Sequence, residues 1–200
     1  MKYRDYKIFR PNHYYHIYNR GNNKEPIFKE PADYLYFLQR LRIILNLEKN
    51  KHSRIKPLPI GAFTIACYCL MDNHFHLLIQ QNSDIGIEKI ISKVCTSYTS
   101  YFNKKYKHTG HVFQDTFKAK LVENDSYMTY LSAYIHNNPN QPFDYEYSSL
   151  DTILGKAHDR LCNKNTILSF FEHSPKLYKS FVANYTKTSE EQIEHLIFEE

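Results

Sequence analysis

The first half of the chain alternates between strand-like and helix-like patterns of apolar residues. Aromatic and β-branched residues predict a strand at residues 14–19, which ends at a turn around Gly21. Directly after a proline, apolar residues recur at every third or fourth position over residues 32–47, and this spacing predicts an amphipathic helix. Two further apolar runs, at residues 60–70 and 74–80, predict a pair of antiparallel strands joined by a tight turn.

The second half continues with helical spacing and then with shorter elements. Helical periodicity returns at residues 85–106, and residues 111–122 alternate in part, which predicts extended chain. A third long helix is predicted at residues 127–138, with Asp125 and Ser126 as its N-cap pair. After a connector that starts at Gln141, the pattern predicts three further helices and an acidic end, at residues 150–154, 165–172, 175–185 and 189–200.

The order of these elements predicts an α+β fold. Strand, helix, two strands and helix is the order of a ferredoxin-like antiparallel sheet with helices packed on one face. We expect residues 1–145 to form this domain and residues 146–200 to form a C-terminal helical extension. A chain of 200 residues is long enough to bury one full core of this kind.

The charge and the aromatic content of the chain favour nucleic acid as a binding partner. Lys and Arg number 26 against 21 Asp and Glu, the sequence pI is near 8.8, and 16% of residues are aromatic. Cationic side chains can meet phosphates and rings can stack on unpaired bases. Many basic proteins without such a function have a similar composition, so composition alone leaves both interpretations open.

Cysteines and apolar runs indicate where the chain resides. Cys67, Cys69, Cys95 and Cys162 show no C-x-x-C spacing, and Cys67 and Cys69 in one strand are expected to be small buried apolar side chains rather than a disulfide. The N-terminus lacks the apolar core of a secretion signal, and no stretch approaches the ~18 apolar residues that a membrane span needs. We therefore expect a cytoplasmic protein without a membrane partner.

The most informative local pattern is His74-Phe75-His76 at the start of a predicted strand. Side chains two apart in a strand share a face, so both imidazoles point the same way with Cα atoms about 6.5–7 Å apart. That spacing lets two imidazoles bind one divalent ion. Chance alone would place roughly 0.6 such pairs in a chain with 11 histidines among 200 residues, so hydrogen-bonded core histidines remain the alternative.

The predicted helix at residues 127–138 carries a second candidate group. Tyr134 and Asn138 lie one turn apart, which sets an amide oxygen beside a phenol hydroxyl on one face of the helix. His136 lies about 200° around the helix from Tyr134 at ~100° per residue, so we do not expect it to be a ligand. Tyr127 and Tyr130 are interpreted as core aromatics.

Four ordered motifs carry a resemblance to a known family. They are His16-Ile17-Tyr18-Asn19-Arg20-Gly21, Met71 to Leu78, Gly110-His111-Val112-Phe113-Gln114 and Tyr134 to Pro139. Over residues 13 to about 150 the chain resembles the HUH single-tyrosine transposases of small insertion sequences, and in particular their REP-associated tyrosine transposase relatives. After Pro139 the chain departs from many of these relatives, which continue with a more basic sequence.

The resemblance implies roles for four residues and a reaction. It implies an HUH endonuclease fold in which His74 and His76 bind the metal, Tyr134 is the nucleophile and Asn138, where many relatives carry Gln, is the third protein ligand. Two imidazoles and an amide oxygen would suit Mg²⁺ or Mn²⁺. The implied activity is cleavage and rejoining of single-stranded or hairpin DNA through a 5′-phosphotyrosine.

Candidate DNA contacts are basic and polar residues near these motifs. A lysine cluster and residues from two of the motifs are candidates, each with an ordinary structural role as the alternative; they are Lys104, Lys105, Lys107, Lys118, Lys120, Arg20, His111 and Gln114.

Two other functions share this site pattern. A domesticated DNA-binding protein could keep the fold without turnover, although the presence of all four site residues argues against lost chemistry. A replication initiator or relaxase fits less well, because the chain is short and carries no helicase segment. The sequence is compatible with a monomer or a homodimer.

Overall fold

A computed structural model describes residues 8–49 and 55–185 of the chain. Its centre is a four-stranded sheet with the order β2-β3-β1-β4, in which every neighbouring pair is antiparallel. The strands are β1 (His13–Arg20), β2 (Phe63–Leu70), β3 (His74–Gln81) and β4 (Lys118–Leu121). The predicted α+β fold with a ferredoxin-like antiparallel sheet is confirmed.

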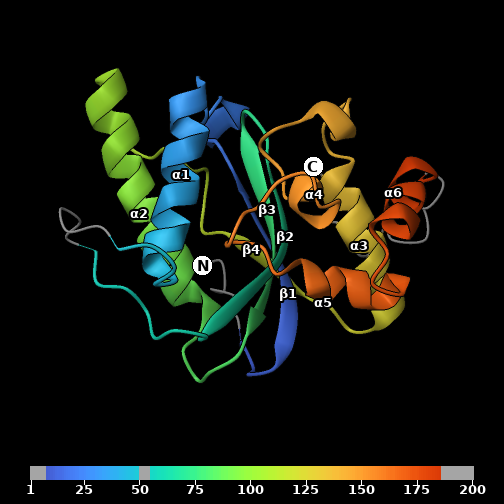
Figure 1. Cartoon of the computed structure of the whole chain (residues 1–200). Helices are drawn as coiled ribbons and strands as arrows, with labels where there is room; N and C mark the ends of the chain where they lie inside the picture. Colours follow the sequence, from blue (N-terminus) through green and yellow to red (C-terminus); the bar gives the residue numbers. More distant parts are fainter. Residues whose placement is uncertain (1–7, 50–54, 186–200) are drawn as a thin grey trace, which may run out of the picture.

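Two long helices cover one face of the sheet. They are α1 (Pro31–Ile44) and α2 (Ile87–Tyr106), which lie side by side in Figure 1. Phe75 projects from β3 into this layer, where its ring lies 5.1 Å from that of Phe37 on α1. The helix α1 ends three residues before the predicted Leu47, and Leu35, assigned from the sequence to its apolar face, is 59% exposed.

The remaining helices lie on the other side of the sheet (Figure 1). Helix α3 (Asp125–His136) packs against β2 and β3, and it is followed by α4 (Leu150–Ile153), α5 (Lys164–Leu168) and α6 (Pro175–Ala183). Short 3-10 turns occur at Asn22–Lys24, Pro142–Asp144 and Ser169–Phe171. Helices therefore flank both faces rather than the one face predicted, because apolar residues of β2 and β3 are buried on both sides.

The C-terminal extension also covers the outer edge of β2. The Leu70 N–H donates to the Tyr147 carbonyl oxygen, and the Ser149 N–H donates to that of Tyr68. Further along, the Asn163 N–H donates to the Ile65 carbonyl oxygen. The extension thus continues the hydrogen bonding of the sheet instead of standing apart from it.

Some predicted boundaries are wrong. The side chain of Asn124, rather than the Asp125-Ser126 pair, accepts the Tyr127 N–H at the start of α3. Of the extended chain predicted at residues 111–122, only β4 is a strand, and Gly21 and Phe113 form an isolated bridge. The predicted acidic end at residues 189–200 lies outside the described residues.

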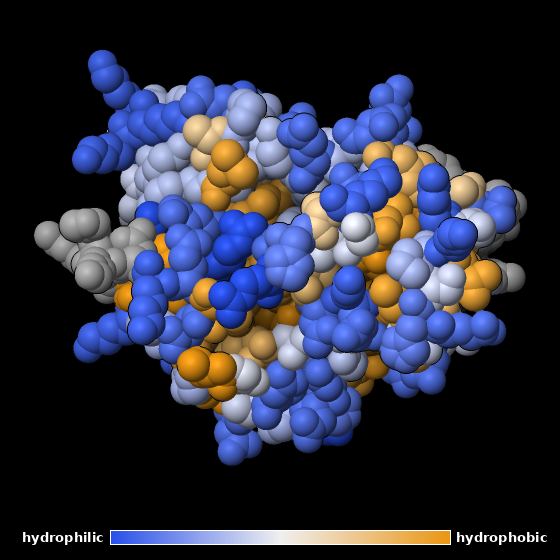
Figure 2. Space-filling view, in the orientation of Figure 1, coloured by the Kyte–Doolittle hydropathy of each residue, from blue (hydrophilic) through white to orange (hydrophobic). Residues whose placement is uncertain are grey.

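In the space-filling view most of the visible face is hydrophilic (Figure 2). Hydrophobic residues show between the polar ones in the middle of that face and over the C-terminal helices. Within the described residues, no helix combines the length and the apolar character needed to cross a membrane.

A buried carboxylate ties α1 to α2. Asp33 on α1 is fully buried, and Lys105 on α2 lies 2.5 Å from its Oδ1 while the Tyr106 hydroxyl donates to its Oδ2. Burial alone would raise the pKa of Asp33, but hydrogen bonds from Lys105 and its neighbours outweigh burial and hold that pKa below its ordinary value of 3.8. Lys105 also pairs with Glu30 at 2.7 Å, so this predicted DNA contact is engaged in joining the two helices.

We expect Asp33→Asn to lower the free energy of unfolding by about 3 kcal/mol at neutral pH, because it breaks a buried ion pair. Since the folded pKa lies below the unfolded value, the stabilisation is complete above the unfolded pKa and is lost as pH falls through the folded pKa. Urea unfolding across the acid range should show the difference between wild type and variant shrinking below pH 3.8. Asp84→Asn, at an exposed aspartate, is the control; a constant wild-type minus Asp33→Asn difference would contradict the expectation.

Candidate active site

The strand register gathers polar side chains on one face of the sheet. Tyr18 of β1 pairs with His76 of β3 on one side and with Lys118 of β4 on the other, while Arg20 pairs with His74. Directly paired residues of antiparallel strands share a face. This face is the one next to α3, opposite the layer that buries Phe75.

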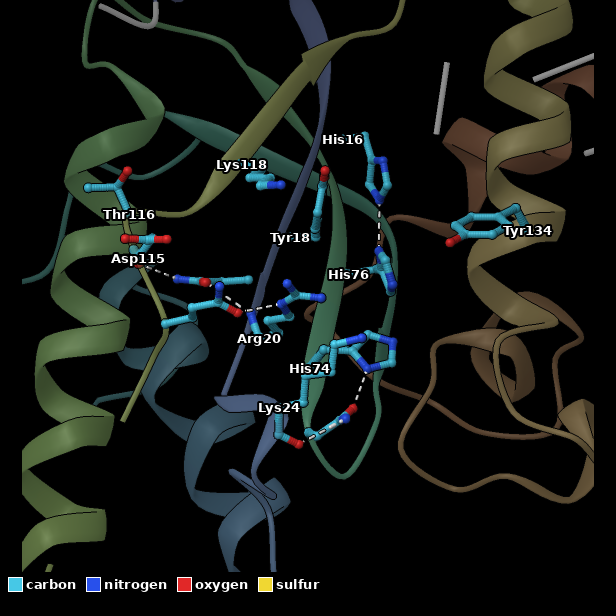
Figure 3. Close-up of a pocket in the computed structure, with 13 residues that line it drawn as sticks. His16, Tyr18, Arg20, Lys24, His74, His76, Asp115, Thr116, Lys118 and Tyr134 are labelled. Atoms are coloured by element: carbon cyan, nitrogen blue, oxygen red, sulfur yellow. Dashed lines mark hydrogen bonds between the residues drawn. The ribbon is translucent and has the colours of Figure 1, made fainter. Parts of the chain in front are cut away.

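A cavity of about 230 Å³ opens over this polar face. Three strands, the loops at their ends and α3 all contribute to its wall (Figure 3). The lining residues are His16, Tyr18, Asn19, Arg20, Lys24, Asn73, His74, His76, Gln114, Asp115, Thr116, Lys118 and Tyr134.

His74 sits between two amide oxygens. Its Nδ1 lies 2.6 Å from Asn73 Oδ1, and its Nε2 lies 2.9 Å from Asn138 Oδ1. A neutral imidazole has only one N–H, so when Nδ1 donates to Asn73, Nε2 presents a lone pair to an amide oxygen. A cation bound to both Nε2 and the amide oxygen would make this pair favourable, and so would an Asn138 amide turned by 180° to present its N–H group.

His76 is buried and has one ring nitrogen without a partner. Its Nδ1 lies 2.8 Å from Nε2 of His16, whereas its Nε2 is buried and makes no hydrogen bond within the described part of the chain. Burial lowers the pKa of His76 well below its ordinary value, and the neighbouring His16 and His74 add to the effect. The ring is therefore neutral at physiological pH and able to donate a lone pair to a metal.

Tyr134 faces the histidines from α3. Its ring centroid lies 5.7 Å from that of His76 and 6.4 Å from that of His16, with each pair of rings nearly perpendicular. Figure 3 shows its hydroxyl end turned from the helix toward the sheet. Tyr134 is partly exposed, so a substrate that enters the cavity can reach it.

These residues fit a divalent ion held by His74, His76 and Asn138. Two ligands in neighbouring positions of an octahedral ion, at bonds of about 2.1 Å, lie roughly 3.0 Å apart, and His74 Nε2 and Asn138 Oδ1 lie 2.9 Å apart. The partnerless His76 Nε2 supplies a third donor atom. Across residues 8–49 and 55–185, no three His, Cys, Asp or Glu side chains form a metal-binding group, so a site here depends on the amide oxygen.

The C-terminal end of α3 is fixed by the extension. His136 is buried, with its Nδ1 2.7 Å from the Tyr178 hydroxyl on α6 and its Nε2 2.9 Å from Ser149 Oγ. Asn137 Nδ2 donates to the carbonyl oxygen of Val182 at 3.1 Å. These contacts hold the segment that carries Asn138, and they agree with the expectation that His136 is not a ligand.

The candidate DNA contacts fall into two groups. Arg20, Gln114 and Lys118 line the cavity, and Arg20 Nε donates to Gln114 Oε1 at 2.5 Å. Lys120 pairs with His16 in the same register, so it belongs to the same region of the sheet. The others lie elsewhere: Lys104 and Lys107 are exposed at the end of α2, Lys105 is paired with Asp33, and His111 lines a second hollow beside Lys29 and Phe102.

Sequence reasoning missed several residues that line the cavity, and two of them lie directly beside His76. His16 and Tyr18 stand in the first motif, but neither was proposed as a site residue. Their rings stack with centroids 5.1 Å apart, and burial raises the pKa of Tyr18, with Tyr134 adding to the rise and Arg20 opposing it. The available signal was the alternation of β1, which places His16, Tyr18 and Arg20 on one face.

The fold and the site together are those expected of the HUH class, with two histidines on a strand facing a helix-borne tyrosine. A family model described as "Transposase IS200 like" matches residues 10–138. The match covers more than half of the chain, and the chain belongs to this family. No curated protein matches it.

One solved structure shows a similar fold. Described as the REP-associated tyrosine transposase bound to a REP hairpin, it has a TM-score of 0.56 at 12% identity, covering 82% of this chain and 97% of that chain. A candidate transposase from Deinococcus radiodurans R1 has a TM-score of 0.41 at 13% identity, covering 68% of this chain and 97% of that chain. The family model confirms the recognition of the transposase family from sequence motifs.

Proposed function

We propose that this chain is a metal-dependent transposase that cleaves and rejoins single-stranded DNA through a covalent bond to Tyr134. The observation that carries the proposal is the position of Tyr134, whose ring lies 5.7 Å from that of His76, a buried ligand with a partnerless Nε2. A noncatalytic DNA-binding protein would not need a tyrosine and two imidazoles to meet in one cavity.

In the proposed reaction the Tyr134 oxygen attacks a DNA phosphorus. A bond forms between the phenol oxygen and phosphorus, the bond from phosphorus to the 3′-oxygen breaks, and the phenol proton passes to solvent. The leaving 3′-oxygen takes up a proton from solvent. The products are therefore a 5′-phosphotyrosine and a free 3′-hydroxyl. Attack by a second 3′-hydroxyl reverses the step and rejoins the strand, so no external energy is needed.

The residues of the cavity have distinct tasks in this proposal. His74, His76 and Asn138 hold Mg²⁺ or Mn²⁺, which when bound neutralises charge that develops on the phosphate. Arg20 and Lys118 are cations at the same cavity and are suited to bind the phosphates on either side. The domain proposed at residues 1–145 supplies this site, and Ser149, Tyr178 and Val182 of the proposed extension hold the end of α3 in place.

Hairpin DNA is the proposed substrate. The structurally similar REP-associated transposase is described as bound to a REP hairpin, and a folded hairpin can be recognised by shape while its single-stranded flank enters the cavity. One chain contains Tyr134, both histidines and Asn138 within the same site, which supports action by a single chain.

A labelling experiment tests the proposal. The probe is a pool of oligonucleotides that each carry a hairpin between randomised single-stranded flanks, labelled at either the 5′ or the 3′ end. With Mn²⁺ or Mg²⁺ we expect the 3′ label to migrate with the protein on a denaturing gel, and no adduct with EDTA. Binding without any adduct would instead identify a noncatalytic DNA-binding protein, and retention of the 5′ label would refute the proposed polarity.

A further inference from the structure

His16 lies where it can orient His76. It stands on β1 opposite Leu78, one diagonal step along the sheet from His76, and both rings are on the face next to α3. The rings are nearly parallel with centroids 5.1 Å apart, and both residues are buried, at 2% and 4% exposure. The only hydrogen bond between them joins His16 Nε2 to His76 Nδ1 at 2.8 Å, drawn as a dashed line in Figure 3.

This hydrogen bond has two possible proton arrangements with different consequences. If His16 Nε2 carries the proton and donates, neutral His76 must carry its own proton on Nε2, which is buried without an acceptor. If His76 Nδ1 carries the proton and donates to His16, His76 Nε2 has a free lone pair. Only the second arrangement lets His76 bind a cation through Nε2.

We propose that His16 is a positioning residue whose Nε2 accepts a hydrogen bond from the Nδ1–H group of His76 and thereby directs the lone pair of His76 Nε2 into the cavity. Metal-bound histidines commonly donate their other ring N–H to a nearby acceptor, which fixes both tautomer and ring orientation. Here the acceptor is a second imidazole from the neighbouring strand. Stacking of His16 on Tyr18 holds that imidazole in turn. This inference rests on the metal site of the proposed function.

Binding of Mn²⁺ alone, measured by the electron paramagnetic resonance of free Mn²⁺, provides the test. Loss of an outer partner of a ligating histidine typically weakens metal binding by about 10–100-fold, and we expect His16→Ala to do the same. Gln can place its Oε1 near the position of His16 Nε2, so His16→Gln should restore most of the affinity. His13→Ala is the matched control, because His13 lies on the same strand but is exposed and contacts the Pro11 carbonyl oxygen.

A second readout uses the wild-type protein, so it does not depend on whether a variant folds. Nitrogen-15 NMR of the metal-free chain should show His76 protonated at Nδ1 and unprotonated at Nε2. A protonated Nε2, or a His16→Ala variant with wild-type Mn²⁺ affinity, would overturn the role of His16.

The outcomes also separate this inference from the proposed function. If wild type binds no Mn²⁺, or if His74→Ala leaves Mn²⁺ affinity unchanged, the metal site itself is refuted and the role of His16 falls with it. If Mn²⁺ binding depends on His74 but not on His16, only the role of His16 is refuted.

Discussion

Replacing Tyr134 with Phe is expected to abolish the covalent protein–DNA adduct while hairpin binding survives. Phe keeps the ring that faces His76 and His16 but lacks the oxygen that would attack phosphorus. A free tyrosine has a pKa near 10 and is a weak nucleophile at pH 7. We therefore expect that a hydroxyl group placed elsewhere cannot form the adduct in place of Tyr134. The adduct is measured on denaturing gels, and binding of the same probe by fluorescence anisotropy.

Tyr18→Phe is the matched control for this experiment. Tyr18 lines the same cavity, and its ring centroid lies 5.8 Å from that of His76, almost the same separation as for Tyr134. Tyr18 therefore meets a simple proximity criterion, but it stands on β1 beside His74 and His76 rather than across from them. An adduct that persists in Tyr134→Phe and disappears in Tyr18→Phe would assign the nucleophile to Tyr18.

Replacing His76 with Ala should reduce metal-dependent adduct formation by about a thousandfold. A metal ion that polarises a phosphoryl oxygen supplies several kcal/mol of transition-state stabilisation, and each 1.36 kcal/mol corresponds to a factor of ten. His76 contributes the one ring nitrogen that is buried and partnerless within the described residues. The rate of adduct formation at saturating DNA and Mn²⁺ is the quantity to measure.

A stability control distinguishes lost chemistry from lost structure. Leu78 lies on the same strand and the same face as His76 and is fully buried. Leu78→Ala should cost about 2–5 kcal/mol of stability through the cavity that it leaves, yet it removes no metal ligand. If Leu78→Ala and His76→Ala lose adduct formation in the same proportion as they lose folded protein, His76 is a structural residue and the metal assignment is wrong.

Local periodicity was sufficient to predict how the histidine pair is presented and which helix carries the tyrosine. Alternation along β3 places His74 and His76 on one face and Phe75 on the other, and helical spacing predicts α3, the helix that carries Tyr134. Each of these relations lies within one element, so it needs no knowledge of the fold. The ferredoxin-like order followed from the succession of elements in the same way.

Relations between elements were not accessible from local pattern. That His16 bonds to His76 depends on the register of β1 against β3, across 60 residues of sequence. Lys105 was assigned to DNA because it stands in a basic run, but packing of α1 against α2 brings Asp33 to it. The position of helices on both faces likewise depended on which sides of β2 are buried.

The covered edge of β2 has a consequence for the proposed division of the chain at residue 145. The strand Phe63–Leu70 contains no charged residue, and its outer N–H and C=O groups are occupied by the segment that begins at Tyr147. A fragment truncated before that segment would expose a long, uncharged template to which a second molecule could add its own strand, as in edge-to-edge aggregation. The C-terminal segment thus covers a strand edge that would otherwise be open to strand addition.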